Sequence, residues 1–157
     1  LSTNVTSVVR FTTHLLPYLE KQNEGGGVML VSSMAGLAPV PYQAAYSGTK
    51  AFLVNYGCSL YHELKERNVS ITTFAPGGIA TEMSESERFD SLRRWLMPAD
   101  RCARAGIDGF RQRKYLHVPG VLYKVLAALS NVAPEPFATS RVAAEYRASL
   151  AASRRQS

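Results

Sequence analysis

The chain has 157 residues, of which 46% are hydrophobic and 19% charged, and this is the size and composition of a single folded domain. Such a composition excludes a disordered chain, and two cysteines are too few for a disulfide scaffold, so we expect a reducing compartment. The formal net charge is +6, and thirteen of the eighteen basic side chains follow residue 81. This skew is typical of a solvated, arginine-rich helical surface, with attraction to an anionic ligand or membrane surface as the alternative.

The sequence contains no motif for a transmembrane segment, a metal site or nucleic-acid binding. The longest strongly apolar stretch, 121–132, is interrupted by Lys124 and is too short to cross a bilayer, so we expect no transmembrane segment. No Cys/His pattern has the spacing of metal ligands, and the basic residues are not interleaved with exposed aromatic residues. We therefore expect neither a metal site nor nucleic acid as a partner. A cytoplasmic location is expected, with peripheral membrane association as the alternative.

The first predicted elements are a helix and a strand joined by glycines. Apolar residues recur at helical spacing from residue 2 to about 22, which predicts an amphipathic helix. The segment 23–27 contains three successive glycines, which suit the end of a helix. Val28–Val31 is entirely apolar and predicts a strand buried on both faces.

The next two elements repeat this order. A loop containing Gly36 and two prolines is expected over 34–43, and it is followed by a helix from about Ala44 to Arg67. Val69–Ala75 predicts a second buried strand, which Pro76 ends. Helix, buried strand, helix, buried strand is the order of a parallel sheet covered on both faces, so we expect an α/β fold.

The second half of the chain predicts helices around one more strand. A basic helix is expected to begin near Pro98 and Asp100, which suit its first turn, and to turn Ala103, Ile107 and Phe110 inward. The remaining expected elements are a strand over Tyr115–Val118, an apolar helix over 121–129 and a last helix near 141–152.

The histidines and the apolar helix carry weaker signals. His14 and His62 are expected on helix surfaces, and His117 is expected to be packed or solvated, with a place facing a pocket as the alternative. The apolar helix 121–129 is expected to pack on the core. A wall of a substrate pocket, a subunit contact and a membrane contact are its alternatives.

Four polar side chains stand at informative places. Tyr46 and Lys50 are four residues apart in the predicted second helix, so both lie on one face. A cation beside a phenol favours the phenolate, which lets the pair exchange a proton near neutral pH. Ser33 comes directly after the first buried strand, and Asn4 lies on the helix before that strand.

These residues, together with the Pro76-Gly77 turn after the next strand, resemble the short-chain dehydrogenase/reductase (SDR) family with its Asn-Ser-Tyr-Lys tetrad. The resemblance covers residues 1 to about 83. It implies an α/β fold that is the carboxyl-terminal part of a doubly wound Rossmann-type parallel sheet, with strands five to seven and their flanking helices. It further implies one partial Rossmann-type domain over 1–157. Residues 1–83 would form its catalytic half, and 84–157 its substrate-side helices and carboxyl-terminal extension.

The resemblance implies a role for each of these side chains. Tyr46 would act as general acid or base, with Lys50 tuning it and holding the nicotinamide ribose. Ser33 would hydrogen-bond the substrate oxygen as charge develops there, and Asn4 would hold a water that connects Lys50 to solvent. The residues implied to bind the cofactor are Tyr46, Lys50, Pro76, Gly77, Ile79 and Thr81.

The implied cofactor is NADP or NAD. A subgroup that shares Val118-Pro119-Gly120 and the apolar helix favours NADP mildly. A glycine-rich turn after the first strand and an Asn-Ala-Gly segment after the fourth are typical of the family, but neither is found in this sequence. The three glycines of 25–27 cannot replace them, because they precede a strand instead of linking a strand to a helix. We therefore expect a truncated chain that is inactive alone.

The implied activity is the interconversion of an alcohol and a carbonyl by hydride transfer on a small, apolar substrate. A homo-oligomer is expected through helices 2–22 and 44–67, which pair between subunits in many family members. Two alternatives stay open: an epimerase or dehydratase on the same fold, and a non-catalytic oligomerisation fragment. Net turnover of the cofactor would separate the enzyme classes.

Overall fold

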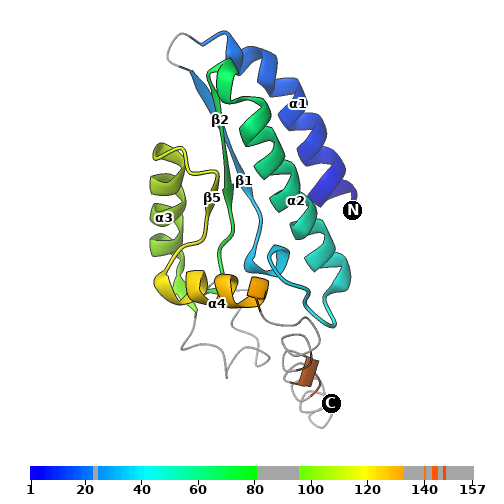
Figure 1. Ribbon diagram of the computed structural model, residues 1–157. Helices are drawn as coiled ribbons and strands as arrows, with labels where there is room; N and C mark the ends of the chain where they lie inside the picture. The colour runs from blue at the N-terminus through cyan, green and yellow to red at the C-terminus, as the bar shows by residue number, and fades with distance from the viewer. Residues whose placement is uncertain (23–24, 81–95, 133–139, 141–142, 145–146, 148–157) are drawn as a thin grey trace.

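Three parallel strands lie between helices on both faces in the computed structural model (Figure 1). The structure describes residues 1–22, 25–80, 96–132, 140, 143–144 and 147. The strand order is β1-β2-β5. The strands are β1 (Gly26–Val31), β2 (Val69–Phe74) and β5 (Leu116–His117). The helices α1 (Ser7–Glu20) and α2 (Ala44–Glu63) cover one face of the sheet, and α3 (Ala99–Arg111) covers the other. The helix α4 (Val121–Val132) lies across the carboxyl ends of the strands. The predicted α/β fold with a parallel sheet is confirmed.

The hydrophobic core lies between the sheet and the helices α1 and α2. Ile71 of β2 is fully buried, and it shares a cluster with Leu30, Leu60, Leu64 and Val69. Burying an apolar side chain of this size contributes about 1.5–3 kcal/mol. The half-buried apolar side chains that pack against this cluster are Val8, Leu16, Leu19, Val28, Tyr56 and Tyr61.

The predicted first helix is present, but its first turn is wider than an α-helix. Residues Ser2–Thr6 form a π-helical turn, and α1 continues from it to Glu20. Thr12 is 2% exposed on the face of α1 that meets the rest of the molecule. Because π-helical turns are found frequently near functional sites, this start of the helix bears on the position of Asn4.

β1 begins two residues before its predicted start and ends at Val31, as predicted. It begins at Gly26, because two glycines let helices approach both faces of the strand. A side-chain carbon added at Gly26 would lie 2.6 Å from Leu19 of α1, and one at Gly27 would lie 2.9 Å from Phe110 of α3. The expected burial of the strand on both faces is wrong, since Val31 is 49% exposed. Within the described residues β1 is an edge strand, so Val31 has a neighbouring strand on one side only.

α2 is shorter than its prediction. It ends at Glu63, and Lys65–Arg67 forms a separate 3-10 turn that Asn68 ends in the left-handed conformation. The helix lies unusually close to the sheet at Gly57, where a side-chain carbon would overlap the Thr73 hydroxyl. This close contact sets the distance between α2 and β2.

α3 turns its small residues toward the sheet. Cys102, Gly106 and Gly109 are buried. Ala103 and Ile107, which the sequence predicts to face inward, are exposed instead. The prediction fails because the sheet lies too close to α3 for larger side chains: carbons added at the two glycines would lie 3.1 Å and 2.5 Å from aromatic rings of the sheet.

β5 is shorter than the predicted strand and places His117 between the sheet and α3. The imidazole stacks on Phe74 with ring centroids 5.8 Å apart and an interplanar angle of 18°. His117 is 9% exposed, so it is packed, as expected, and it also lines a cavity, which was the alternative. His14 and His62 are exposed on their helices, also as expected.

A second, two-stranded sheet was not expected from the sequence. β3 (Ile79–Ala80) and β4 (Met97–Pro98) pair in parallel. Pro98 therefore precedes α3 as its N-cap and does not occupy the first helical turn. Three predictions lie outside the described residues. They are the position of Thr81, the boundary between residues 83 and 84, and most of the helix expected near 141–152. Among the described helices, none has the length and apolarity needed to cross a membrane.

Candidate active site

The turns that follow β1 and β2 are joined at the carboxyl end of the sheet. The Ser32 N–H donates to the Phe74 carbonyl at 2.7 Å, which extends the strand pairing, and the Met34 N–H donates to the Pro76 carbonyl at 2.9 Å. Ser33 lies between these two bonds and caps the short 3-10 helix Met34–Gly36, because its Oγ accepts the Ala35 N–H at 3.2 Å. Ser33 is thus held beside the Pro76 turn, with its hydroxyl proton available to donate.

Tyr46 and Lys50 lie in the first turns of α2 and face the same way. The Lys50 Nζ is 5.7 Å from the centroid of the Tyr46 ring, which is within cation–π distance. Tyr46 is 42% exposed, so its phenol is accessible. The predicted pairing of these two side chains is therefore present in the structure.

A second contact fixes the Lys50 ammonium against the end of β1. Its Nζ donates to the Val31 carbonyl at 2.9 Å. Burial lowers the pKa of Lys50 from its ordinary value, because a partly desolvated ammonium is disfavoured. The hydrogen bond to the Val31 carbonyl also fixes where the ammonium lies. One N–H of the ammonium is used in this way and two remain.

Polar groups that the sequence analysis did not single out lock the Ser33 turn to α2. The buried Ser32 hydroxyl donates to the Lys50 carbonyl at 2.7 Å. The Ser47 hydroxyl donates to the Ala35 carbonyl at 2.7 Å. Gly36 lies so close to α2 that a side-chain carbon there would be 2.5 Å from the Lys50 carbonyl oxygen. The only signal of this docking in the sequence is that small and hydroxyl residues are found on both segments.

Asn4 contacts α2 one residue away from Lys50. Its Nδ2 donates to the Thr49 Oγ1 at 3.4 Å, and the Thr49 hydroxyl donates to the Tyr46 carbonyl at 2.7 Å. Asn4 lies in the π-helical turn and is half-buried. The structure thus brings Asn4 to the helix that carries Tyr46 and Lys50, but its described contact is with Thr49.

The Pro76 turn is held from two sides. Pro76 is buried, and the Tyr123 ring of α4 packs so closely on Gly77 that no side chain fits there. The Tyr123 hydroxyl lies 3.5 Å from the Gly78 carbonyl, which also accepts the Met97 N–H at 2.9 Å. Burial is the largest cause of a raised pKa of Tyr123. Tyr123 is a contact of this turn that the sequence analysis missed.

Of the two other residues predicted to bind the cofactor from this turn, the structure describes Ile79 but not Thr81. Ile79 is half-buried and pairs with Met97 between β3 and β4. Thr81 lies outside the described residues.

Two cavities lie elsewhere on the molecule. One, of about 640 Å³, is on α1 and is lined by Val9, Arg10, Thr13, His14, Pro17, Tyr18 and Lys21. The other, of about 310 Å³, lies between β5 and α4. None of the predicted site residues lines either of these two cavities.

Comparison with known proteins finds a family profile and a curated relative that match this chain. A sequence profile described as "short chain dehydrogenase" matches residues 1–91, which include Asn4, Ser33, Tyr46 and Lys50. The chain is 38% identical over 111 residues to a hydroxysteroid 11-beta-dehydrogenase 1-like protein of Gallus gallus, and the match covers 69% of this chain and 38% of that protein.

Experimentally determined structures share the fold. A short-chain dehydrogenase from Sphingobium yanoikuyae in complex with NADPH superposes with a TM-score of 0.65 at 24% identity, covering 75% of this chain and 46% of that one. An enzyme of the same class from Burkholderia phymatum in complex with NAD gives 0.67 at 21% identity, covering 80% and 54%. The chain therefore spans between 38% and 54% of the lengths of these three proteins.

Proposed function

This chain belongs to the short-chain dehydrogenase family, and from that premise we propose that the protein carrying it is an NAD(P)-dependent oxidoreductase that interconverts an alcohol and a carbonyl compound. The observation that carries this proposal is the position of the Lys50 ammonium, 5.7 Å from the Tyr46 ring on the helix that docks against the Ser33 turn. A phenol, an ammonium and a serine hydroxyl at one sheet end form a proton-transfer site.

The described residues fit the nicotinamide and ribose part of such a cofactor. The turn after β2 offers two successive glycines, Gly77 and Gly78, at the sheet end where open α/β folds bind ligands. Lys50 keeps two N–H groups for ribose hydroxyls after its bond to Val31. Tyr46, Lys50, Pro76, Gly77, Ile79 and Thr81 are the residues that we propose to hold the cofactor.

A nicotinamide held by these residues would supply hydride chemistry at the substrate carbon, and the protein's own part is the movement of a proton at the Tyr46 hydroxyl. Tyr46 gives its proton to the carbonyl oxygen during reduction and takes it back during oxidation. Lys50 tunes this proton transfer through its positive charge, which lies 5.7 Å from the centroid of the Tyr46 ring. Ser33 donates a hydrogen bond to the substrate oxygen, which stabilises charge that develops there.

Asn4 has a supporting place in this proposal. Its amide is bound to Thr49, next to Lys50, so a water held between Asn4 and the ammonium would connect the site to solvent. Such a water would return the proton to Tyr46 after each turnover. This role depends on the wide π-helical turn, which carries Asn4 toward α2.

The choice of cofactor and substrate follows from what the relatives bind. The two structural neighbours bind NADPH and NAD, which supports a nicotinamide cofactor without separating the two forms. We keep the mild preference for NADP. The name of the Gallus gallus relative refers to a hydroxysteroid, an apolar alcohol, which supports a small, apolar substrate. Residues 1–83 are proposed as the catalytic half, and 84–157 as the substrate-side half.

We also propose a homo-oligomer, formed through the helices predicted over 2–22 and 44–67, in a cytoplasmic protein. Three large side chains support this surface: Phe11 and Tyr18 on α1 are 66% and 58% exposed, and Phe52 on α2 is 38% exposed. Exposed aromatic residues that gather on neighbouring helices are typical of subunit interfaces.

Activity is tested in the protein that carries this chain, with NADPH or NADH and a panel of apolar ketones, by the absorbance of the reduced cofactor at about 340 nm. Net loss of absorbance supports the proposal. Change at a stereocentre without net loss would assign an epimerase instead. Ser33→Ala is expected to lower kcat by about 10²–10³-fold, the usual cost of one oxyanion donor. Ser59→Ala, an exposed change on α2, is the matched control.

A further inference from the structure

The cavity between β5 and α4 has a polar character that the proposed reaction does not use. Its volume is about 310 Å³, which is at the lower end of the range for small-molecule sites. Its lining residues are Lys114, Tyr115, Leu116, His117, Val118, Lys124 and Ala127. Two of these seven residues are lysines and none is acidic, so the lining carries positive charge.

The free edge of β5 adds backbone donors to it. The carbonyls of Tyr115 and His117 accept bonds from β2, so both residues turn their backbone groups toward the sheet. Because the backbone groups of neighbouring residues in a strand point to alternate edges, Leu116 and Val118, which both line the cavity, turn their N–H groups to the other edge of β5. In the part of the chain that the structure describes, neither of these N–H groups has a hydrogen-bond partner.

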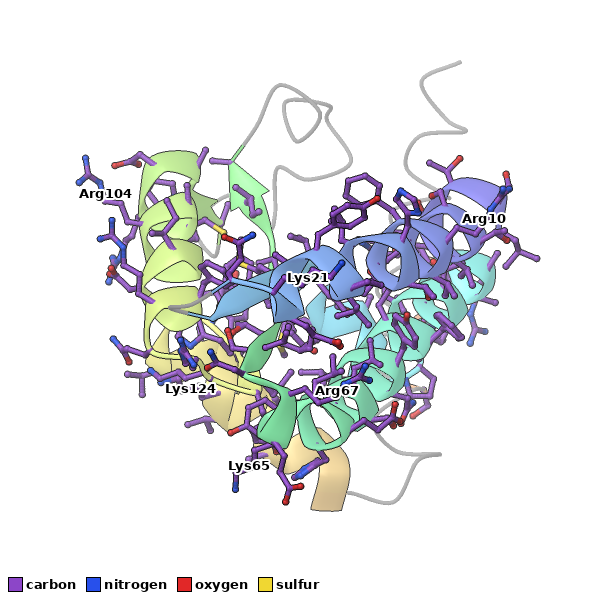
Figure 2. The ribbon with its side chains drawn as sticks, turned by 90° about the horizontal axis from the view of Figure 1, so that it is seen from above. Arg10, Lys21, Lys65, Arg67, Arg104 and Lys124 are labelled. Carbon is purple, nitrogen blue, oxygen red and sulfur yellow. The ribbon has the colours of Figure 1, made fainter. Side chains whose placement is uncertain are left out.

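Two of the three charged groups that shift the pKa of His117 are lysines that line the cavity. Lys114 is half-buried and Lys124 exposed, and Figure 2 shows Lys124 on the α3 and α4 side of the molecule, away from Arg10 on α1. Burial lowers the pKa of His117, and the positive charges of Lys114 and Lys124 lower it further. The Ala105 carbonyl, which accepts an imidazole hydrogen bond, and the Asp108 carboxylate act in the opposite direction.

We propose that this cavity binds a phosphate group, held by the ammonium groups of Lys114 and Lys124 and by the outward N–H groups of Leu116 and Val118. Ammonium groups and unpaired backbone N–H groups are the donors that phosphate oxygens accept. A bound dianion places negative charge near the imidazole, so it favours protonated His117. Phosphate binding and protonation of His117 are therefore coupled.

The test uses the whole chain and nuclear magnetic resonance of its three histidines, which His14→Asn and His62→Asn assign. Inorganic phosphate is added in one arm and glycerol 3-phosphate in the other, against sodium chloride at equal ionic strength. We expect a saturable change of the His117 signal and an upward shift of its midpoint by about one pH unit, equivalent to about tenfold tighter binding to the protonated form. The exposed His14 and His62 serve as internal controls. The arm that saturates at the lower concentration identifies free phosphate or a phosphomonoester as the source.

Lysine variants decide whether the cavity is the site. Lys114→Ala and Lys124→Ala change partly or fully exposed side chains and are expected each to weaken binding at least about threefold. Lys65→Ala, which removes a lysine that does not line the cavity, is expected to leave binding unchanged. A His117 response that chloride reproduces, or that persists in full in Lys114→Ala/Lys124→Ala, would overturn the proposal, as would no response in either arm.

Discussion

Gly36 offers the sharpest test of how the Ser33 turn is docked on α2. A side-chain carbon added there would lie 2.5 Å from the Lys50 carbonyl oxygen and 2.6 Å from its carbonyl carbon. Both are backbone atoms, so they cannot turn aside as a flexible side chain would. Gly36→Ala therefore forces the 3-10 helix Met34–Gly36 away from α2, and with it Ser33, which caps that helix.

The expected cost follows from the contacts that must yield. Overpacking of this kind costs about 1–3 kcal/mol. The Ser32 hydroxyl, which donates to the Lys50 carbonyl at 2.7 Å, would lose its bond at a further cost of about 1 kcal/mol. Alanine also reduces the conformational entropy of the unfolded chain, which stabilises the folded state by about 0.4–1 kcal/mol. We expect Gly36→Ala to lower the free energy of unfolding by about 1–3.6 kcal/mol, or Tm by about 2–14 °C.

Gly48 provides the matched control, because it stands between Tyr46 and Lys50 and has open space around it. Nothing lies within 4 Å of a side-chain carbon added there. Since alanine is a better helix former than glycine, Gly48→Ala is expected to raise the free energy of unfolding by about 1 kcal/mol. Urea denaturation followed by circular dichroism measures both variants. A Gly36→Ala protein as stable as the parent chain would refute the proposed docking.

Three other outcomes are expected. Gly57→Ala should be less stable than Gly48→Ala by about 1–3 kcal/mol in the same urea experiment, because its side-chain carbon would overlap the Thr73 hydroxyl, and equal stability of the two variants would contradict the close contact of α2 with β2. Burial, together with nearby Lys114 and Lys124, lowers the pKa of His117, so the unfolded chain binds a proton that the folded chain does not. The free energy of unfolding should therefore fall as the pH drops below about 6.5, and this part of the fall should be lost in His117→Asn but kept in His14→Asn. Phe11→Ser should weaken self-association at least about tenfold by analytical ultracentrifugation, whereas Ile107→Ser on α3 should not, and equal effects would remove α1 from the interface.

The order of elements was predictable because it depends on local patterns. Apolar runs and helical periodicity, ended by glycine and proline, indicate the two helices and two strands of the first half. The common face of Tyr46 and Lys50 follows from helix geometry alone. Ser33 could be placed at the sheet end because it directly follows a strand.

What could not be predicted depends on contacts distant in sequence. The bond from Ser32 to the Lys50 carbonyl joins residues 18 positions apart, and it exists only because Gly36 lets the two segments meet. The inward face of α3 was mispredicted for the same kind of reason. Counting apolar residues favours Ile107, but the space above the aromatic rings of the sheet admits only Gly106, Gly109 and similarly small residues.

The most direct test of the central claim is turnover by Tyr46→Phe in the protein that carries this chain. Removing one hydroxyl from a 42% exposed side chain leaves the ring and its contact with Lys50 in place, so folding should be preserved. We expect kcat to fall by about 10²–10⁴-fold, while Tyr56→Phe, on the same helix, keeps its activity. A Tyr46→Phe enzyme with turnover close to that of the parent would show that another group transfers the proton.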